Sequence, residues 1–87
     1  MRKAVTKEQI DKTVKKILEK LKYTLHKKGP LALVSRHEIL GVLEEEIHEL
    51  KSTCSENLLE NFEHELMDVV IAAIFGLICL QGDHLEW

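Results

Sequence analysis

The sequence LMDVVIAAIFGLICL, residues 66–80, is the most apolar stretch of the chain and decides how the chain can fold. From Val69 to Leu80 it runs for 12 residues without a strongly polar side chain, which is too short to cross a bilayer and suits a buried helix. A helix that is apolar on all sides must be surrounded by other elements. Because 87 residues supply few elements to cover it, we expect a homodimer or homotetramer with this helix in the interface.

Outside this stretch, apolar residues recur at intervals of three and four, and sustained alternation with period two is absent. The pattern predicts an all-α protein with helices over about 7–27, 36–52 and 55–80, in a single domain spanning 1–87. The last two helices are joined by a short connection, which favours antiparallel neighbours. We therefore expect helical hairpins that form a four-helix-type bundle, completed by homo-oligomerisation.

The ends of the first two helices carry recognisable capping residues. Thr6 is expected to cap the first helix, and Gly29 followed by Pro30 is expected to end it. Ser35 and Glu38 have the spacing of a capping box at the start of the second helix.

Two positions bear on the third helix. Thr53 with Glu56 is a candidate capping box for its start. Gly76 is a poor helix former, so the pattern leaves open whether the helix continues there or divides into two.

Charge is divided unevenly along the chain. Residues 1–28 hold ten Lys/Arg and three acids, a net of +7, whereas residues 29–87 hold two Lys/Arg and twelve acids, a net of −10. The split is consistent with two oppositely charged faces that pair, or with an acidic metal site that has basic groups nearby. The acidic balance of the whole chain argues against a nucleic-acid polymer as partner.

Targeting signals are not evident. The basic segment at residues 1–28 lacks the apolar core of a signal peptide, and no membrane partner is expected. Cys54 and Cys79 do not form a Cys-x-x-Cys pair and are interpreted as reduced thiols in a cytoplasmic protein.

Four carboxylates have the spacing of a metal site. Glu46 and Glu49 lie three residues apart on the second helix, and Glu65 and Asp68 lie three residues apart on the third. Residues at this spacing share a helix face, so antiparallel packing would turn the two pairs toward each other. Carboxylates gathered beside apolar residues repel one another, and a divalent cation that prefers oxygen ligands would relieve the repulsion. A solvated acidic face is the competing interpretation.

The order of these acids resembles a known signature. The motif EExxE at residues 45–49 is followed after fifteen residues by ExxD at 65–68, which is similar to the motif of MazG-like all-α nucleotide pyrophosphohydrolases, a group related to dimeric dUTPases. The resemblance covers about residues 35–80, and the helix at 7–27 fits the first helix of the family in position only.

The resemblance implies a Mg²⁺-dependent enzyme, with Mn²⁺ as an alternative, that cleaves a nucleoside triphosphate to the monophosphate and pyrophosphate, as in cleansing of the nucleotide pool. The residues that match the metal ligands of the family are Glu46, Glu49, Glu65 and Asp68. Glu45 would orient a ligand or water without binding the metal. Glu46 or Glu49 would take the proton of the attacking water, and the sequence does not decide between them.

Basic groups near the end of the first helix could assist the phosphates. Lys22, Lys27 and Lys28 are the candidates, although a solvated basic face is the simpler interpretation of any single lysine. Two other functions stay open: a non-enzymatic helical module for oligomerisation or interaction, and a relative that binds nucleotide without cleaving it.

Overall fold

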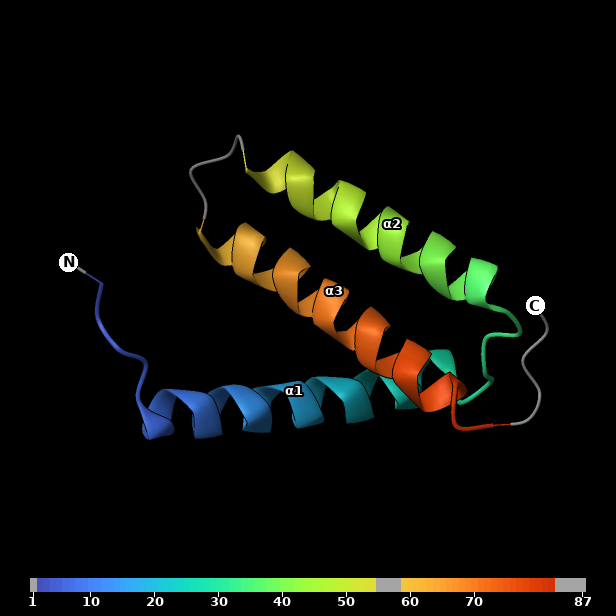
Figure 1. Cartoon of the computed structure of the whole chain (residues 1–87), viewed down its shortest axis with the longest axis horizontal. Coiled ribbons are helices and arrows are strands. Elements are labelled where there is room, and N and C mark those ends of the chain that lie inside the picture. Colours follow the sequence, from blue (N-terminus) through green and yellow to red (C-terminus); the bar gives the residue numbers. More distant parts are fainter. Residues whose placement is uncertain (1, 55–58, 83–87) are drawn as a thin grey trace. The chain divides into compact units, whose positions relative to one another are not determined.

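The computed structural model describes residues 2–54 and 59–82, and this part of the chain is helical and holds no strand. The helices are α1 (Lys7–Lys28), α2 (Arg36–Thr53) and α3 (Leu59–Cys79), and Figure 1 shows them along the chain. The prediction of an all-α protein is confirmed for these residues. Of the third helix expected at 55–80, residues 55–58 lie outside the described part.

The chain divides into two compact units, Met1–Pro30 and Leu31–Trp87. The first unit contains α1, and the second contains α2 and α3. The single domain expected over residues 1–87 stays a prediction.

Local hydrogen bonds close both ends of α1. Thr6 Oγ1 accepts from the backbone N–H of Gln9 at 3.1 Å, and Gln9 Oε1 accepts from the backbone N–H of Thr6 at 2.9 Å. This reciprocal pair is a complete capping box. At the other end, Gly29 adopts a φ of 88°, which glycine tolerates best, and its N–H donates to Leu25 O at 2.9 Å. The expected cap and stop of this helix are confirmed.

The start of α2 differs in one bond from the expected capping box. Ser35 Oγ accepts from the backbone N–H of Glu38 at 3.1 Å, as predicted. The Glu38 carboxylate, however, accepts from the backbone N–H of Val34 at 3.3 Å. The Glu38 carboxylate therefore accepts from the backbone N–H of Val34, the residue before the cap, and not from that of Ser35. Ser35 itself has an extended backbone.

The end of α2 involves Thr53. Its Oγ1 donates to Leu50 O at 2.7 Å, and the side chain is buried. Thr53 is the last residue of α2, so it does not cap the start of α3. Its expected box partner, Glu56, lies outside the described residues.

α2 and α3 pack side by side, and Figure 1 shows them running in opposite directions. The buried residues of α3 are Ile71, Gly76 and Cys79. α3 continues without a break through Gly76, and a Cβ built on this glycine would lie 2.8 Å from Ile39 Cγ2. The glycine therefore permits a close approach of the two helices, which answers the question that the sequence left open.

The connection before α2 is tied to the end of α3. The backbone N–H of Leu33 donates to Cys79 Sγ at 3.3 Å. Both Cys79 and Gly76 lie in the last turn and a half of α3, so two close contacts join this end of α3 to α2 and to the connection before it.

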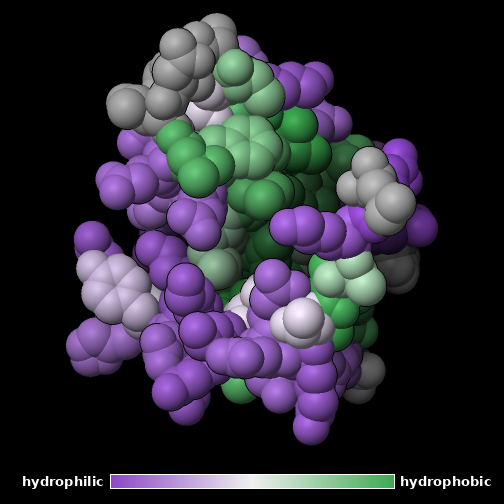
Figure 2. Space-filling view, turned by 90° about the vertical axis from the view of Figure 1, so that its left-hand side faces the viewer, coloured by the Kyte–Doolittle hydropathy of each residue, from purple (hydrophilic) through white to green (hydrophobic). Residues whose placement is uncertain are grey.

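Apolar side chains at this end of α3 also remain open to solvent. Leu77 is 62% exposed and Leu80 is 48% exposed, and Figure 2 shows apolar side chains in green between hydrophilic ones. Among the described residues, none of the helices combines the length and apolarity needed to traverse a bilayer.

Candidate metal centre

Three of the four predicted ligands come together between α2 and α3. Glu46 and Glu49 lie on α2, and Glu65 lies on α3. One carboxylate oxygen from each lies within 4.8 Å of those of the other two. The arrangement follows from the spacing of three residues on α2, which presents two carboxylates to the partner helix.

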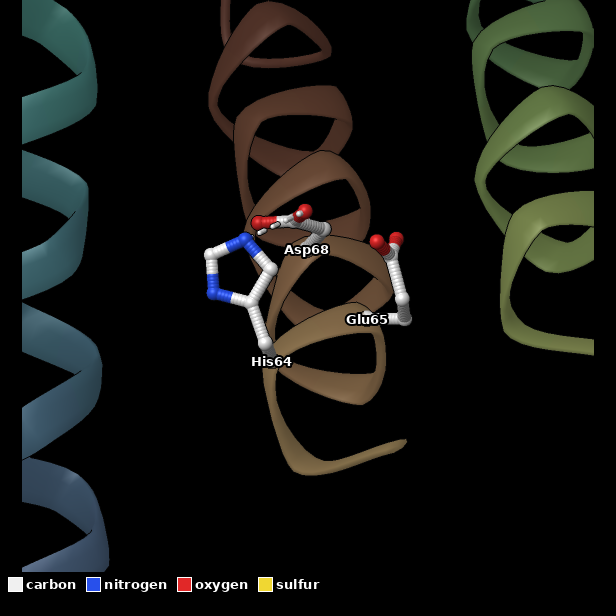
Figure 3. A group of neighbouring side chains, drawn as sticks. All are labelled: His64, Glu65 and Asp68. Atoms are coloured by element: carbon white, nitrogen blue, oxygen red, sulfur yellow. Dashed lines mark ion pairs between the residues drawn. The ribbon is translucent and has the colours of Figure 1, made fainter. Parts of the chain in front are cut away.

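Asp68 belongs to a second group, with Glu65 and His64, whose ligand atoms also lie within 4.8 Å of one another. Asp68 Oδ2 is 3.7 Å from His64 Nε2. Figure 3 shows that Glu65 points toward α2, whereas the Asp68 carboxylate lies beside the His64 ring. Glu65 is therefore the member common to both groups.

His64 is not among the site residues that the sequence predicts. It is exposed, but its spacing of four residues from Asp68 places the two side chains on adjacent turns of α3. That spacing was the signal that could have identified the pair.

The environment of Glu65 disfavours its negative charge. Desolvation by burial raises the pKa of Glu65 most, and the negative charges of Asp68 and Glu49 raise it further. A side-chain hydrogen bond with Glu49 acts in the same direction, while the charge of His64 lowers the pKa. The Oε2 atom of Glu65 is shielded from solvent. A bound cation would favour the ionised form that this environment opposes.

The two groups differ in the cation they suit. Glu46, Glu49 and Glu65 offer only carboxylate oxygens, the ligand type that Mg²⁺ and Mn²⁺ prefer. In an octahedral Mg²⁺ site, with bonds of about 2.1 Å, two ligand oxygens are separated by at most about 4.2 Å, and the oxygens of this group lie within 4.8 Å of one another. The donor type of the three carboxylates therefore suits the expected cation, whereas the imidazole of His64 gives the other group a mixed donor set.

The remaining predicted site residues lie outside both groups. Glu45 is an exposed residue of α2. Lys22, Lys27 and Lys28 are exposed residues of α1, which belongs to the other unit. Lys27 Nζ lies 5.7 Å from the centre of the Tyr23 ring, a cation–π distance. The roles expected for these four residues stay predictions.

No protein-family model, curated protein or solved structure matches the chain. The resemblance to MazG-like pyrophosphohydrolases therefore rests on the two acidic motifs and their spacing.

Proposed function

We propose that this protein is a Mg²⁺-dependent nucleoside triphosphate pyrophosphohydrolase of the MazG-like type. The observation that carries the proposal is the meeting of Glu46, Glu49 and Glu65, from two helices, with their oxygens within 4.8 Å of one another. These are three of the four residues that the family motif would assign to metal binding. The proposed reaction comes from the resemblance to the family motif. The proposed binding of Mg²⁺ is supported by the meeting of the three carboxylates.

The carboxylates of the chain would have two roles, metal binding and proton transfer. Glu46, Glu49 and Glu65 would hold the cation, and Asp68 would complete its ligands from the next turn of α3. When bound, Mg²⁺ would neutralise phosphate oxygens and make water a better nucleophile at neutral pH. Glu49 is more exposed than Glu46, the other candidate base, so we propose Glu49 as the general base. It would accept the proton of the water that attacks phosphorus as pyrophosphate departs.

The charge split supports a nucleotide that arrives with its cation. The unit containing the carboxylates belongs to the part of the chain with net charge −10, which repels bare phosphates. The basic residues of α1, among them Lys22, Lys27 and Lys28, would attract the triphosphate from the same or a second subunit.

Self-association is part of the proposal. We infer that the α2–α3 pair is a hairpin that forms a four-helix-type bundle with a second copy, as a homodimer or homotetramer. The supporting observation is the apolar surface of α3 and its flank, where the exposed residues include Leu66, Leu77, Ile78 and Leu80. Large contiguous apolar patches mark interaction surfaces, so we propose that these side chains pack against a second copy.

A cytoplasmic location accords with the cysteines. Cys54 and Cys79 are both free thiols, and free thiols are the normal state in a reducing compartment. The proposed substrate, a nucleoside triphosphate with Mg²⁺, belongs to the same compartment.

The decisive experiment is product analysis combined with metal titration. The full chain is incubated with a panel of canonical and modified nucleoside triphosphates, with and without Mg²⁺ or Mn²⁺. We expect monophosphate and pyrophosphate from at least one substrate, only when metal is present. If no substrate is cleaved at high enzyme concentration while Mg²⁺ and a nucleoside triphosphate still bind, the protein is a nucleotide-binding relative without turnover.

A non-enzymatic interaction module is the second candidate. It is favoured by α1, none of whose residues is buried and whose Ile10, Val14 and Leu18 are each about half exposed. This candidate predicts no heat of Mg²⁺ binding by calorimetry. It also predicts that changing Glu49 alters only stability or association.

A further inference from the structure

A side chain at Gly76 would meet a much closer neighbour than a side chain at Gly29 or Gly41 would. A Cβ at Gly76 would lie 2.8 Å from Ile39 Cγ2, whereas Gly29 and Gly41 have nothing within 4 Å. To reach 3.4 Å, the lower limit of ordinary contact, Ile39 Cγ2 would have to retreat by about 0.6 Å.

Ile39 cannot yield this space by a simple rotation. Cγ2 is attached directly to its β-branched carbon, and χ1 of such residues in a helix is held largely in one rotamer. Ile39 lies in the first turn of α2, which Ser35 caps through the N–H of Glu38. A side chain at Gly76 would therefore move α2 and α3 apart.

The contact lies on the same inter-helix seam as the carboxylates. Ile39 and Glu46 are seven residues apart on α2, and Gly76 and Glu65 are eleven residues apart on α3. At 3.6 residues per turn, these separations are about two and about three turns, so each pair shares one face of its helix. Because both helices are continuous over these spans, a change in helix separation at Gly76 would also shift Glu46 and Glu49 relative to Glu65.

We propose that Gly76 is a positioning residue for the metal centre: it sets the spacing of α2 and α3 at which carboxylates from both helices share one cation. The inference rests on the proposed metal site. A displacement of about 0.6 Å exceeds the roughly 0.2 Å within which metal–ligand distances are normally held, so a Gly76 side chain weakens metal binding without touching a ligand.

The test uses calorimetric titration of the full chain with MgCl₂ and MnCl₂, beside circular dichroism to verify that each variant is folded. We expect Gly76→Ala to lower Mg²⁺ affinity by about tenfold or more, the scale of changes around metal ligands. Gly41→Ala is the matched control, since it adds the same methyl group to a helix where nothing lies within 4 Å. It is expected to leave the affinity unchanged and to raise the melting temperature.

A second substitution at Ile39 distinguishes an effect on helix spacing from a general loss of stability in Gly76→Ala. Ile39→Leu removes Cγ2 and can place its single γ-carbon where Ile39 has Cγ1, which lies 3.9 Å from the built Cβ. Ile39→Val retains Cγ2. In the Gly76→Ala background, Ile39→Leu is expected to restore Mg²⁺ affinity and Ile39→Val is not. If Gly76→Ala alone does not fold, the two double variants are compared with each other.

The outcomes are distinct. Unchanged Mg²⁺ affinity in a folded Gly76→Ala variant overturns the positioning role and leaves the proposed metal site intact. Equal affinity of the two double variants also overturns it, since the contact with Cγ2 would not matter. Absence of Mg²⁺ and Mn²⁺ binding by the unaltered chain overturns the metal site and, with it, the role of Gly76.

Discussion

α1 and the α2–α3 pair are helical for different physical reasons. α1 closes its own ends, through the reciprocal bonds of Thr6 with Gln9 and the bond from Gly29 to Leu25, and none of its residues is buried. The α2–α3 pair instead buries Ile71 and approaches closely at Gly76. Local bonds alone give a helix only marginal stability, so the two regions should respond differently to the same kind of substitution.

The same division separates the charges. α1 lies in the segment with net charge +7, and the α2–α3 pair lies in the segment with net charge −10. On α1 every charged side chain except that of Lys20 is exposed, whereas Glu46, Glu65 and Asp68 are half-buried. Charge on α1 is therefore easily solvated, while charge between α2 and α3 carries a cost that a bound cation would remove.

The largest effect is expected from Glu65→Gln. Because Glu65 belongs to both candidate ligand groups, its loss should lower Mg²⁺ affinity by more than about a hundredfold, beyond the usual effect of changes around metal ligands, and abolish turnover. Calorimetry and product analysis measure the two quantities. Glu63→Gln, at an exposed position of the same helix, is the control and should leave Mg²⁺ affinity and turnover unchanged. Full activity of Glu65→Gln would remove Glu65 from the site.

The next effect concerns packing. Ile71, 6% exposed, changed to Ala should lower the free energy of unfolding by roughly 2–5 kcal/mol. Val14→Ala in α1, where the side chain is 49% exposed, should cost less than about 1 kcal/mol. Urea denaturation at one fixed protein concentration compares them. Equal losses would mean that α1 is as well covered in the assembled protein as α3.

A smaller effect is expected from Thr6→Ala. Losing the cap of α1 should cost about 1 kcal/mol, since one backbone N–H at the helix start loses its acceptor. Hydrogen exchange should show faster exchange in the first turn of α1 and unchanged protection in α2 and α3. Loss of protection throughout the chain would instead show that the two units unfold together.

The smallest effect is the pH dependence of the metal-free protein. The folded-state pKa of Glu65 is raised, so the folded state binds this proton more tightly than the unfolded chain does. The contribution of Glu65 to the free energy of unfolding is therefore highest below the ordinary pKa of a glutamate, and it falls as pH rises through the raised value. Chemical denaturation in a chelating buffer measures it. Glu65→Gln should flatten the slope, and saturating Mg²⁺ should do the same; a slope that persists in Glu65→Gln must arise from other groups.

Much of this structure could be predicted because its causes lie close together in the sequence. The bounds of α1 and α2 follow from Thr6, Gly29 and Ser35, whose bonds join residues three or four positions apart. The pairing of Glu46 with Glu49 likewise needs only helical spacing. The bond from Val34 to Glu38 and the bond from Thr53 to Leu50 were not predicted, because each depends on the local path of the backbone rather than on residue type.

Helix type, both ends of α1, the start of α2 and the acidic motifs were determined by the sequence itself, because short-range periodicity and capping encode them. Only the tertiary structure decided which carboxylates meet. It placed Glu65 with Glu46 and Glu49, and it turned Asp68 toward His64. It also showed why position 76 suits a glycine, since the absence of a side chain matters only where another helix packs against it. Such contacts depend on the separation and rotation of two helices, quantities that no local pattern specifies.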